Sequence, residues 1–390
     1  MRKDRVLVSF VAALVLAGAV FLVPSPTSAQ PPPPGQPRFQ VDPYAGYPDR
    51  TVRPAPGGDA SILASGPTRA LVADPDTIAP ATGSQYVTYG TSVYDLGTCG
   101  ASAPGNRYYV PYIVSGLDDA VNLDNECITG DAMPAGPGAW AEPNSPIWAP
   151  SVVYFGGRYI LYYTASRQGS GQPGQKCIGK AGSASPTGPF SDSGEVACPD
   201  TGRWAIDPDA FVHNGALYMI YRDDAITAGP ETGISVVRMT STGAADWPTR
   251  KEVFESTDIS WESIDATNHI IENPTMMNVG GNWMVFYSGN SWNTARYSTG
   301  IALCPSPLPP ARCTPYASTT QPYFGYTGEP SGINPLYGLP RNERGPGGMS
   351  LFRNRAGDAR VVWHFLEGAT TVRRGMVGVL SFNGLVWAVS

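Results

Sequence analysis

Three acidic side chains stand in similar settings along the chain and could act together in proton transfer. Each lies ahead of a proline that opens a short apolar segment: Asp74 in ADPD, Asp207 in AIDPD and Glu272 in IENP. Carboxyl groups held together in one pocket cannot all ionise easily, so one of them has a raised pKa. A protonated carboxyl beside an ionised one can serve as acid and base. A single Asp before Pro is also a common start of a turn, so the fold must bring the three together.

The three acids fall at one place in a pattern that recurs along the chain. A proline opens an apolar strand, a turn with Gly or Asn follows, and an aromatic strand then ends in a small polar residue. Gly156-Gly157 and Asn214-Gly215 are examples of hairpin turns between such strands. The copies occupy residues 74–92, 149–166, 207–222, 272–288 and 345–365, and their leading prolines are residues 75, 150, 208, 274 and 346.

Five such copies predict an all-β protein with the fold of a five-bladed β-propeller, in which repeated sheets surround an axis. The first strand of every blade lines the axis, so equivalent positions face one another and the acids should converge. The other two copies have Ala149 and Gly345 there. We expect residues 375–389 to close the ring by pairing with the first blade. A two-sheet β-sandwich is the alternative, although it would not require the pattern to restart regularly.

The composition excludes several classes of protein. The chain of 390 residues has 45 glycines and 39 prolines, and only 15% of its residues are charged. Such frequent turns exclude long helical bundles and coiled coils. The formal charge of −6 and the lack of a basic run after the N-terminus argue against nucleic acid as a partner. We found no HExxH or GxSxG motif, which argues against a zinc protease or a serine hydrolase.

The N-terminus has the features of an export signal. A basic start is followed by the apolar run Val6–Val23 and by small residues before position 30, which predicts a cleaved signal peptide over residues 1–29. An uncleaved anchor is the alternative, because 18 apolar residues can span a bilayer. We expect no stable membrane span after cleavage. Residues 30–65 then form a Pro-rich linker, and residues 66–390 form the propeller. We expect an extracellular bacterial protein, with cell-wall association as a further option, and a monomer.

Six cysteines follow the signal segment. An even number in an exported chain predicts disulfides, although six cysteines allow 15 pairings. The sequential pairing closes short loops and is our prediction. It joins Cys99 to Cys127, Cys177 to Cys198 and Cys304 to Cys313.

Several of these segments, taken together, resemble glycoside hydrolase family 43. The segments that carry the resemblance are WAPSVVYFGGRYILYY (148–163), CIGKAGSASPTGPF (177–190), AIDPDAFV (205–212), IENPTMM (271–277) and FYSGNSWNTARYSTGIALC (286–304). The resemblance covers roughly residues 68–390, and its motifs follow in the family's order.

This resemblance implies a five-bladed propeller that hydrolyses O-glycosyl bonds with inversion. It implies a base at Asp74, an acid at Glu272, and at Asp207 a carboxylate that orients the acid and raises its pKa. The substrates implied are poly- or oligosaccharides with arabinofuranosyl or xylosyl linkages. Many arabinanases of the family have a GPGH motif whose His helps to hold a central metal ion. Gly348 stands at that position here, so we expect no metal and no cofactor, against the alternative of a central calcium.

Four more residues are candidates for substrate binding. Trp148 precedes the second blade and could stack on a sugar ring, although a core tryptophan is the alternative. Asn290, Trp292 and Arg296 lie in the loop GNSWNTAR, which could form a wall of the site or a turn held by Asn side chains. We expect His364 to be a core residue or a support of the site rather than a metal ligand.

The sequence therefore predicts a secreted inverting glycosidase. Two alternatives stay open. One is a propeller that binds glycans without cutting them, although it would not need both Asp74 and Glu272. The other is a related propeller enzyme that acts on fructosides or other furanosides with a nucleophilic Asp in the first blade and retains configuration.

Overall fold

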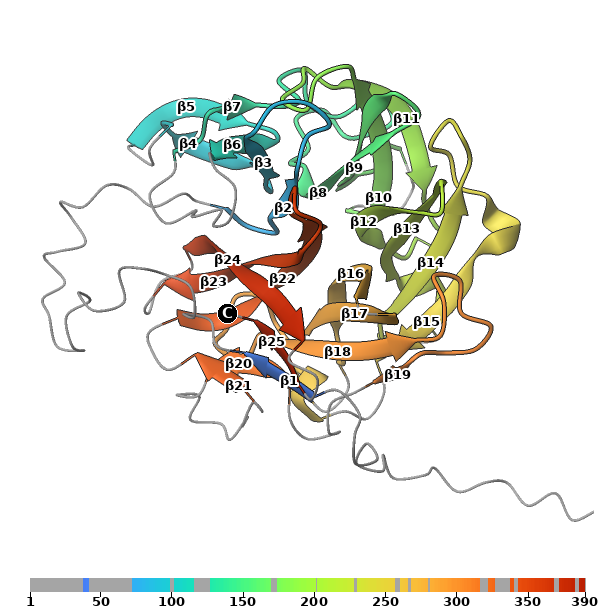
Figure 1. Cartoon of the computed structure of the whole chain (residues 1–390). Coiled ribbons are helices and arrows are strands. Elements are labelled where there is room, and N and C mark those ends of the chain that lie inside the picture. The colour runs from blue at the N-terminus through green and yellow to red at the C-terminus, as the bar shows by residue number, and fades with distance from the viewer. Residues whose placement is uncertain are drawn as a thin grey trace, which may run out of the picture. The chain divides into compact units, whose positions relative to one another are not determined.

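Each copy of the repeat forms one blade of a five-bladed propeller in a computed structural model of the chain (Figure 1). The structure describes residues 38–41, 72–98, 102–115, 127–169, 174–200, 202–227, 230–256, 260–265, 268–279, 281–315, 322–326, 337–339, 343–367, 372–382 and 386–389. The expected signal segment, residues 1–29, lies outside them. No helix within the described ranges is long and apolar enough to cross a membrane.

The first three blades follow the chain order, each as an antiparallel four-stranded sheet. Blade 1 also has an inserted hairpin, β4 (Val93–Leu96) and β5 (Ser102–Tyr108). Blade 1 consists of β2 (Asp76–Ile78), β3 (Tyr86–Tyr89), β6 (Pro111–Ser115) and β7 (Gly130–Asp131). Blade 2 consists of β8 (Trp148–Phe155), β9 (Arg158–Ser166), β10 (Lys176–Ser183) and β11 (Ser191–Ala197). Blade 3 consists of β12 (Ala205–His213), β13 (Ala216–Asp223), β14 (Gly233–Met239) and β15 (Lys251–Glu255).

The last two blades have additional strands. Blade 4 is built on β16 (Ile271–Val279), β17 (Asn282–Gly289) and β18 (Ser298–Cys304), and continues through β19 (Thr314–Pro315), β20 (Phe324–Tyr326) and β21 (Tyr337–Leu339). Blade 5 contains β22 (Glu343–Arg353), β23 (Ala359–Glu367), β24 (Arg373–Phe382) and β25 (Val386–Val389). Its outer edge is β1 (Arg38–Val41).

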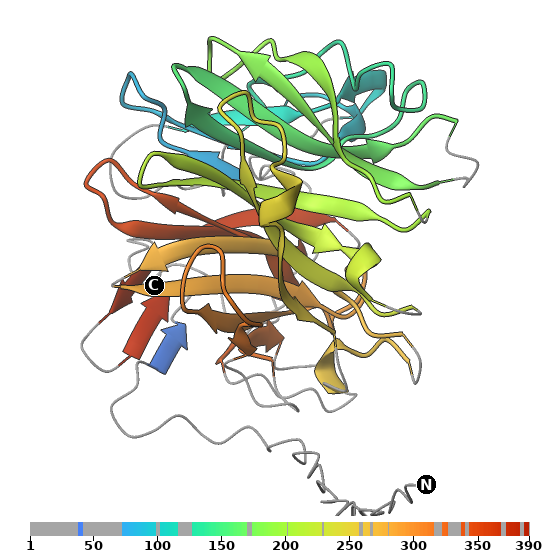
Figure 2. The ribbon, with the colours of Figure 1, turned by 90° about the vertical axis from the view of Figure 1, so that its right-hand side faces the viewer.

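The closing strand differs from our expectation. The C-terminal strands β24 and β25 stay in blade 5, and β25 pairs in parallel with β1 instead of joining blade 1. Figure 2 shows β1 in blue beside the red C-terminal strand, with both arrows pointing the same way. A short stretch of the predicted linker thus extends the last sheet. The prediction that residues 375–389 pair with the first blade is wrong.

Apolar side chains fill the space between neighbouring blades. The described core divides into five clusters, and each joins the facing sheets of two adjacent blades. Tyr162 and Met219 join blades 2 and 3 in this way, and Phe286 and Trp363 join blades 4 and 5. Every residue of β9 after Arg158 is buried, as expected for a strand covered on both faces. The sheets are therefore held to one another mainly by hydrophobic packing.

The inner strands leave two residues outside the ladder near their start, in a bulge in blades 2 to 5 and just before β2 in blade 1. The pairing of the first strand with the second shifts between Trp148 and Ser151 in blade 2, and the same shift recurs in blades 3, 4 and 5. In blades 1 to 4 the second bulged residue is a proline, which has no N–H to pair in a ladder. The first has a left-handed backbone in every blade: Asp74 (φ 48°), Ala149 (40°), Asp207 (54°), Asn273 (47°) and Gly348 (58°).

These angles correct two parts of the predicted repeat. The residue of blade 4 that is equivalent to Asp74 and Asp207 is Asn273, and Glu272 comes one residue earlier. In blade 5 the equivalent residue is Gly348, followed by Met349, rather than Gly345 and Pro346. The sequence reading aligned blade 5 on Pro346, but that proline belongs to an earlier register shift, between Arg344 and Gly347.

Two layers of hydrogen bonds join the five inner strands around the axis. In the first layer, the N–H of each left-handed residue donates to a side chain of the preceding blade. The five bonds are Asp74 to His364 Nδ1 (3.1 Å), Ala149 to Thr91 Oγ1 (2.9 Å), Asp207 to Thr164 Oγ1 (3.0 Å), Asn273 to Asp207 Oδ2 (3.1 Å) and Gly348 to Ser288 Oγ (2.8 Å).

The second layer lies two residues further along the inner strands. Its members are Asp76, Ser151, Asp209, Thr275 and Ser350. Their side chains again connect all five blade junctions, through Ser350 Oγ to Asp76 Oδ1 (2.8 Å), Val152 N to Asp76 Oδ2 (2.7 Å), Ala210 N to Ser151 Oγ (3.0 Å), Thr275 Oγ1 to Asp209 Oδ2 (2.8 Å) and Leu351 N to Thr275 Oγ1 (3.0 Å).

Removing one of these links should destabilise the propeller. Thr275 is fully buried and serves two junctions, so Thr275→Val leaves the Leu351 N–H without its acceptor. We expect the free energy of unfolding to fall by about 1–3 kcal/mol in urea titrations. The exposed Thr242→Val is the matched control and should change it by less than about 0.5 kcal/mol. Equal effects of the two substitutions would contradict a role for this layer.

The same layer should make stability depend on pH. Burial raises the pKa of Asp209 to about 8, above the ordinary value of 3.8. A carboxyl that binds its proton more tightly when folded stabilises the fold at low pH, and this contribution is lost as pH rises from about 4 to about 8. Asp209→Asn should flatten that part of the profile in urea titrations at several pH values. Asp246→Asn, which changes an acid in the connection between β14 and β15, should leave the slope as it is in the wild type.

Candidate active site

A pocket of about 310 Å³ opens at the end of the axis where the inner strands begin. The three predicted acids all line it, so the fold brings together Asp74, Asp207 and Glu272. The other side chains on its surface are Thr91, Trp148, Trp204, Ile206, Asn273, Trp292 and Arg373.

Two neighbouring positions of each bulge supply this pocket. The left-handed position provides Asp74, Asp207 and Asn273 near the axis. The preceding residue faces the pocket from the wall, and there blades 2, 3 and 4 have Trp148, Ile206 and Glu272. Glu272 therefore enters the site beside Asn273 rather than in its place. The spacing of IENP, with one residue between the acid and the proline, already contained this difference.

Asp74 is held as an ionised carboxylate. Burial by itself would raise its pKa, but nearby donors outweigh burial and place the pKa below 3.8. Arg373 Nη1 lies 3.1 and 3.2 Å from the two carboxylate oxygens, Thr91 Oγ1 donates at 2.7 Å, and Asn273 Nδ2 donates at 3.3 Å. This group can accept a proton during a reaction.

Glu272 is in a different electrostatic state. Its Oε2 accepts a hydrogen bond from Arg222 Nη1 at 2.9 Å, and its Oε1 accepts one from the Tyr297 hydroxyl at 3.0 Å. Arg222 is itself shared with Asp224, which it contacts at 2.8 and 3.0 Å. Burial raises the pKa of Glu272, and the cation and the hydroxyl reverse this only in part. Glu272 can thus hold a proton that it later gives away.

Asp207 is the acid between the other two. Burial raises its pKa well above 3.8, and the negative charges of Glu272 and Asp74 raise it further. Its Oδ2 also accepts the N–H of Asn273, so its position is fixed by the first layer of inter-blade bonds. Asp207 and Glu272 repel each other's negative charge, and the pair therefore retains a proton at a pH where ordinary carboxyls have lost theirs.

Asn273 and Tyr297 connect Asp74, whose pKa is lowered, to Glu272, whose pKa is raised. The Asn273 amide donates one hydrogen to Asp74 Oδ1 and the other to the Tyr297 oxygen at 3.0 Å, and Tyr297 donates in turn to Glu272. Each donor in this chain has one acceptor, so the amide and the hydroxyl fix both carboxyl groups. When an acid and a base are held in fixed positions around one pocket, one can give a proton and the other can accept one in the same reaction.

The predicted binding residues divide into two groups. Trp148 and Trp292 line the pocket: Trp148 has the Lys176 ammonium over its ring at 4.2 Å, and Trp292 is 46% exposed. Arg296 does not line it. Asn290 lies in a neighbouring hollow, and its amide donates to the carbonyls of Trp261 and Ser263 at 3.1 and 2.7 Å. Asn290 is therefore engaged in holding the loop, the alternative that the sequence left open.

Sequence reasoning missed several residues of the site. Asn273 could have been found, because it is the residue directly before Pro274. Arg222 could also have been noticed, since it ends an aromatic strand where the repeat otherwise places a small polar residue, and it pairs with Ile206 as Thr164 pairs with Trp148. Arg373 had no such signal, because it belongs to the third strand of blade 5 and no motif surrounds it.

The residues near the axis do not fit a bound metal. A Cβ at Gly348, where the metal-holding His of the GPGH motif would stand, would lie 2.6 Å from His364 Nδ1. Burial lowers the pKa of His364 to about 3, so its ring is neutral. Its Nδ1 accepts the Asp74 N–H, which places the ring proton on Nε2 and leaves neither nitrogen free to bind a cation. The axial cavity of about 20 Å³ holds a single water at most.

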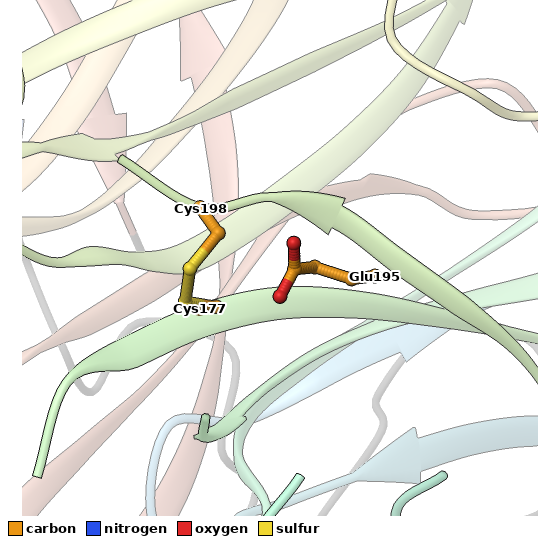
Figure 3. Close-up of side chains that lie close together, drawn as sticks. All are labelled: Cys177, Glu195 and Cys198. Carbon is orange, nitrogen blue, oxygen red and sulfur yellow. A yellow bond between two sulfur atoms is a disulfide. The ribbon is translucent and has the colours of Figure 1, made fainter. Parts of the chain in front are cut away.

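One cluster in the described residues has metal-like spacing, and it is also unsuitable. Cys177, Glu195 and Cys198 lie together on blade 2 (Figure 3). The two sulfur atoms are joined in a disulfide, and Glu195 pairs with Arg167 at 2.9 Å. This pairing and the Cys304–Cys313 disulfide were both predicted. Cys127 is disulfide-bonded too, but its expected partner, Cys99, lies outside the described residues.

A hollow of about 420 Å³ lies at the other end of the inner strands. It contains Asp76 and Asp209 but none of the three predicted acids, and its walls are mostly apolar and aromatic. Both of these carboxyls are engaged in the second inter-blade layer. The candidate site is therefore the smaller pocket, where a carboxyl with a lowered pKa and carboxyls with raised pKa values occur together.

We compared the chain with known families, sequences and structures. The model of the family Glycosyl hydrolases family 43 matches residues 119–370. No curated protein sequence matches the chain.

Solved structures resemble the fold. A thermostable family-43 glycoside hydrolase is 22% identical, with 82% of this chain and 93% of that chain covered and a TM-score of 0.61. An endo-1,4-beta-xylanase from Bacteroides thetaiotaomicron is 20% identical, with 83% and 96% covered and a TM-score of 0.57. A native arabinanase from Bacillus subtilis is 20% identical, with 81% and 96% covered and a TM-score of 0.53. At these identities the likeness concerns the fold.

The electrostatic coupling of the two acids can be measured directly. Glu272→Gln removes the negative charge that helps to raise the pKa of Asp207, so that pKa should fall. Carboxyl ¹³C chemical shifts of Asp-labelled protein, with Asp207→Asn to assign the signal, would report it. Glu262→Gln is the matched control, because Glu262 is also fully buried but binds Tyr287 outside the pocket. A pKa of Asp207 unchanged by Glu272→Gln would contradict the coupling.

Proposed function

The chain belongs to glycosyl hydrolases family 43 and is a glycosidase, and from this premise we propose that it cleaves arabinofuranosyl or xylosyl linkages of poly- or oligosaccharides with inversion. The observation that carries the proposal is the pair of opposite pKa shifts in one pocket. Asp74 has a lowered pKa and Glu272 has a raised one. Inverting hydrolysis needs an ionised base and a protonated acid around the same anomeric carbon.

In the proposed reaction each acid has one role. Asp74 accepts a proton from a water molecule while the water oxygen forms a bond to the anomeric carbon. The glycosidic C–O bond breaks at the same time, and Glu272 gives its proton to the leaving oxygen. Asp207 keeps the pKa of Glu272 high by repelling its negative charge, which is the role the resemblance implies. Trp148 and Trp292 offer aromatic faces to the sugar.

We propose in addition that the protein acts outside the cell. The basic start, the apolar run Val6–Val23 and the even number of cysteines support export. Disulfides at Cys177–Cys198 and Cys304–Cys313 are typical of an oxidising compartment. A polysaccharide substrate would also be met there.

The test is a substrate panel with product anomers followed by NMR. The mature protein would be incubated with arabinan, arabinoxylan, xylan, galactan, and aryl furanosides and pyranosides. We expect release of arabinose or xylose with inverted configuration. Glu272→Gln and Asp74→Asn should each lower kcat/KM by at least about 100-fold, because each removes a proton-transfer group. Glu262→Gln, a buried glutamate outside the pocket, should retain activity.

The other outcomes separate the alternatives. Products of retained configuration would favour a nucleophilic Asp74 and overturn the proposed mechanism. Tight binding of a glycan with no product from any substrate would favour a binding propeller. Full activity of Glu272→Gln would remove Glu272 from the role of acid.

A further inference from the structure

Arg373 has a place in this site that neither the repeat nor the family motifs assign. We infer that the Arg373 guanidinium supplies, beside Asp74, the positive charge that a central divalent metal would otherwise provide, so that this active site works without a metal. The inference rests on the proposed role of Asp74 as the base. It concerns how that base is kept ionised among other acids.

The balance of charge around the pocket requires a cation near Asp74. Three largely buried carboxyls, Asp74, Asp207 and Glu272, share one pocket. Arg222 is committed elsewhere, because it contacts Glu272 at 2.9 Å and Asp224 at 2.8 Å. Arg373 alone of the described cations lies within salt-bridge distance of Asp74, at 3.1 Å. Without it, the negative charge of Asp74 would lie beside the Asp207–Glu272 pair with only neutral donors.

Within the described part of the chain, the groups that face Asp74 come from several elements. From β24 comes Arg373, and from β23 comes the neutral ring of His364. The nearby acids are Asp207 on β12 and Glu272 on β16, and the remaining neighbours are the neutral side chains of Thr91, Asn273 and Tyr297. Since His364 is uncharged, the guanidinium is the positive charge in this set.

The same contacts oppose a metal at this position. A divalent cation would be repelled by the guanidinium, and the lone pairs of Asp74 are already engaged by Arg373, Thr91 and Asn273. The space that a residue 348 side chain would need is occupied by the His364 ring. A neutral imidazole and an arginine thus stand where the arabinanase-like pattern has a His-bound ion.

Arg373 also reaches the wall of the pocket. Its guanidinium lies 4.8 Å from the centre of the Trp292 ring, within the range of a cation–π contact. Trp292 is half-exposed, and Arg373 is itself mostly buried at this contact. The same cation therefore positions a base on the axis and an aromatic wall on the loop after β17.

The first arm of the test does not use activity. The wild-type protein, dialysed against a chelator, would be analysed for Ca²⁺, Mg²⁺, Mn²⁺ and Zn²⁺ by mass spectrometry, and its melting temperature would be measured with and without added Ca²⁺. We expect less than about 0.1 metal ion per chain and no change in melting temperature, since a ligand that binds only the folded state raises it. A stoichiometric ion, or stabilisation by Ca²⁺, would overturn the inference.

The second arm uses the pH profile of kcat/KM on the substrate found in the panel. In Arg373→Met the base should protonate more easily, so the ratio of kcat/KM at pH 5 to that at pH 7 should fall about tenfold relative to wild type. Arg373→Lys, which retains the charge, should restore most of this ratio. Arg312→Met, which breaks a surface pair with Glu255, is the matched control and should leave the ratio unchanged.

The outcomes distinguish this inference from the proposed function. A wild type that is inactive on every substrate would overturn the proposed function. The metal analysis would still test whether an ion binds near Asp74. If the wild type is active and kcat/KM falls at low pH to the same extent in Arg373→Met, the inference alone is overturned. An Arg373→Met variant that loses activity equally at all pH values, or that Arg373→Lys does not rescue, would show a structural role instead and also overturn it. If Arg373→Met does not fold, Arg373→Gln replaces it in the same comparison.

Discussion

Five backbone N–H groups, one from each blade, are the constraint on which this structure depends. They belong to the left-handed residues at the bulges, and each donates to a side chain of the preceding blade. These N–H groups can donate to side chains because the bulge takes them out of the hydrogen-bond ladder between the strands. The arrangement fixes where the inner strands begin, and so it fixes Asp74 and Asp207. Asp74 and Asp207 therefore belong both to the candidate site and to the hydrogen bonds that close the ring of blades.

The three acids of the site have different electrostatic surroundings because equivalent positions of the blades hold different residue types. The wall residue of each blade pairs with a residue of its second strand, and in blades 2, 4 and 5 that partner is Thr164, Ser288 or His364, which accepts an N–H. In blade 3 the partner is Arg222, which reaches Glu272 instead. Asp207 then takes over the task of accepting the Asn273 N–H. One change of residue type therefore gives Glu272 a counter-ion and gives Asp207 a second, structural role.

Much of this could be predicted from the sequence, because the repeat is local. Proline positions, hairpin turns and apolar strands are encoded within 20 residues, so five blades and the meeting of Asp74, Asp207 and Glu272 followed from them. Details that depend on contacts between distant strands did not follow. Arg373 and Tyr297 are brought to the site only by closure of the ring, and the pairing of β25 with β1 joins the two ends of the described chain. The alignment of blade 5 failed because its bulge has Met349 where the others have proline.

The wall position has a consequence for how such a site can diversify. Trp148, Ile206, Glu272 and Gly347 are equivalent, yet they share neither size nor charge, while the next residue in each blade is bound into the axis. At Trp148 and Ile206, substitution alters the shape of the pocket without removing a bond of the first inter-blade layer. The next residue is held in the left-handed region, where few side chains are tolerated, and at Asp207 a substitution also removes the acceptor of the Asn273 N–H. Pocket shape and closure of the ring are thus assigned to adjacent residues, so replacement of Trp148 or Ile206 can change which sugar fits while the hydrogen bonds around the axis stay the same.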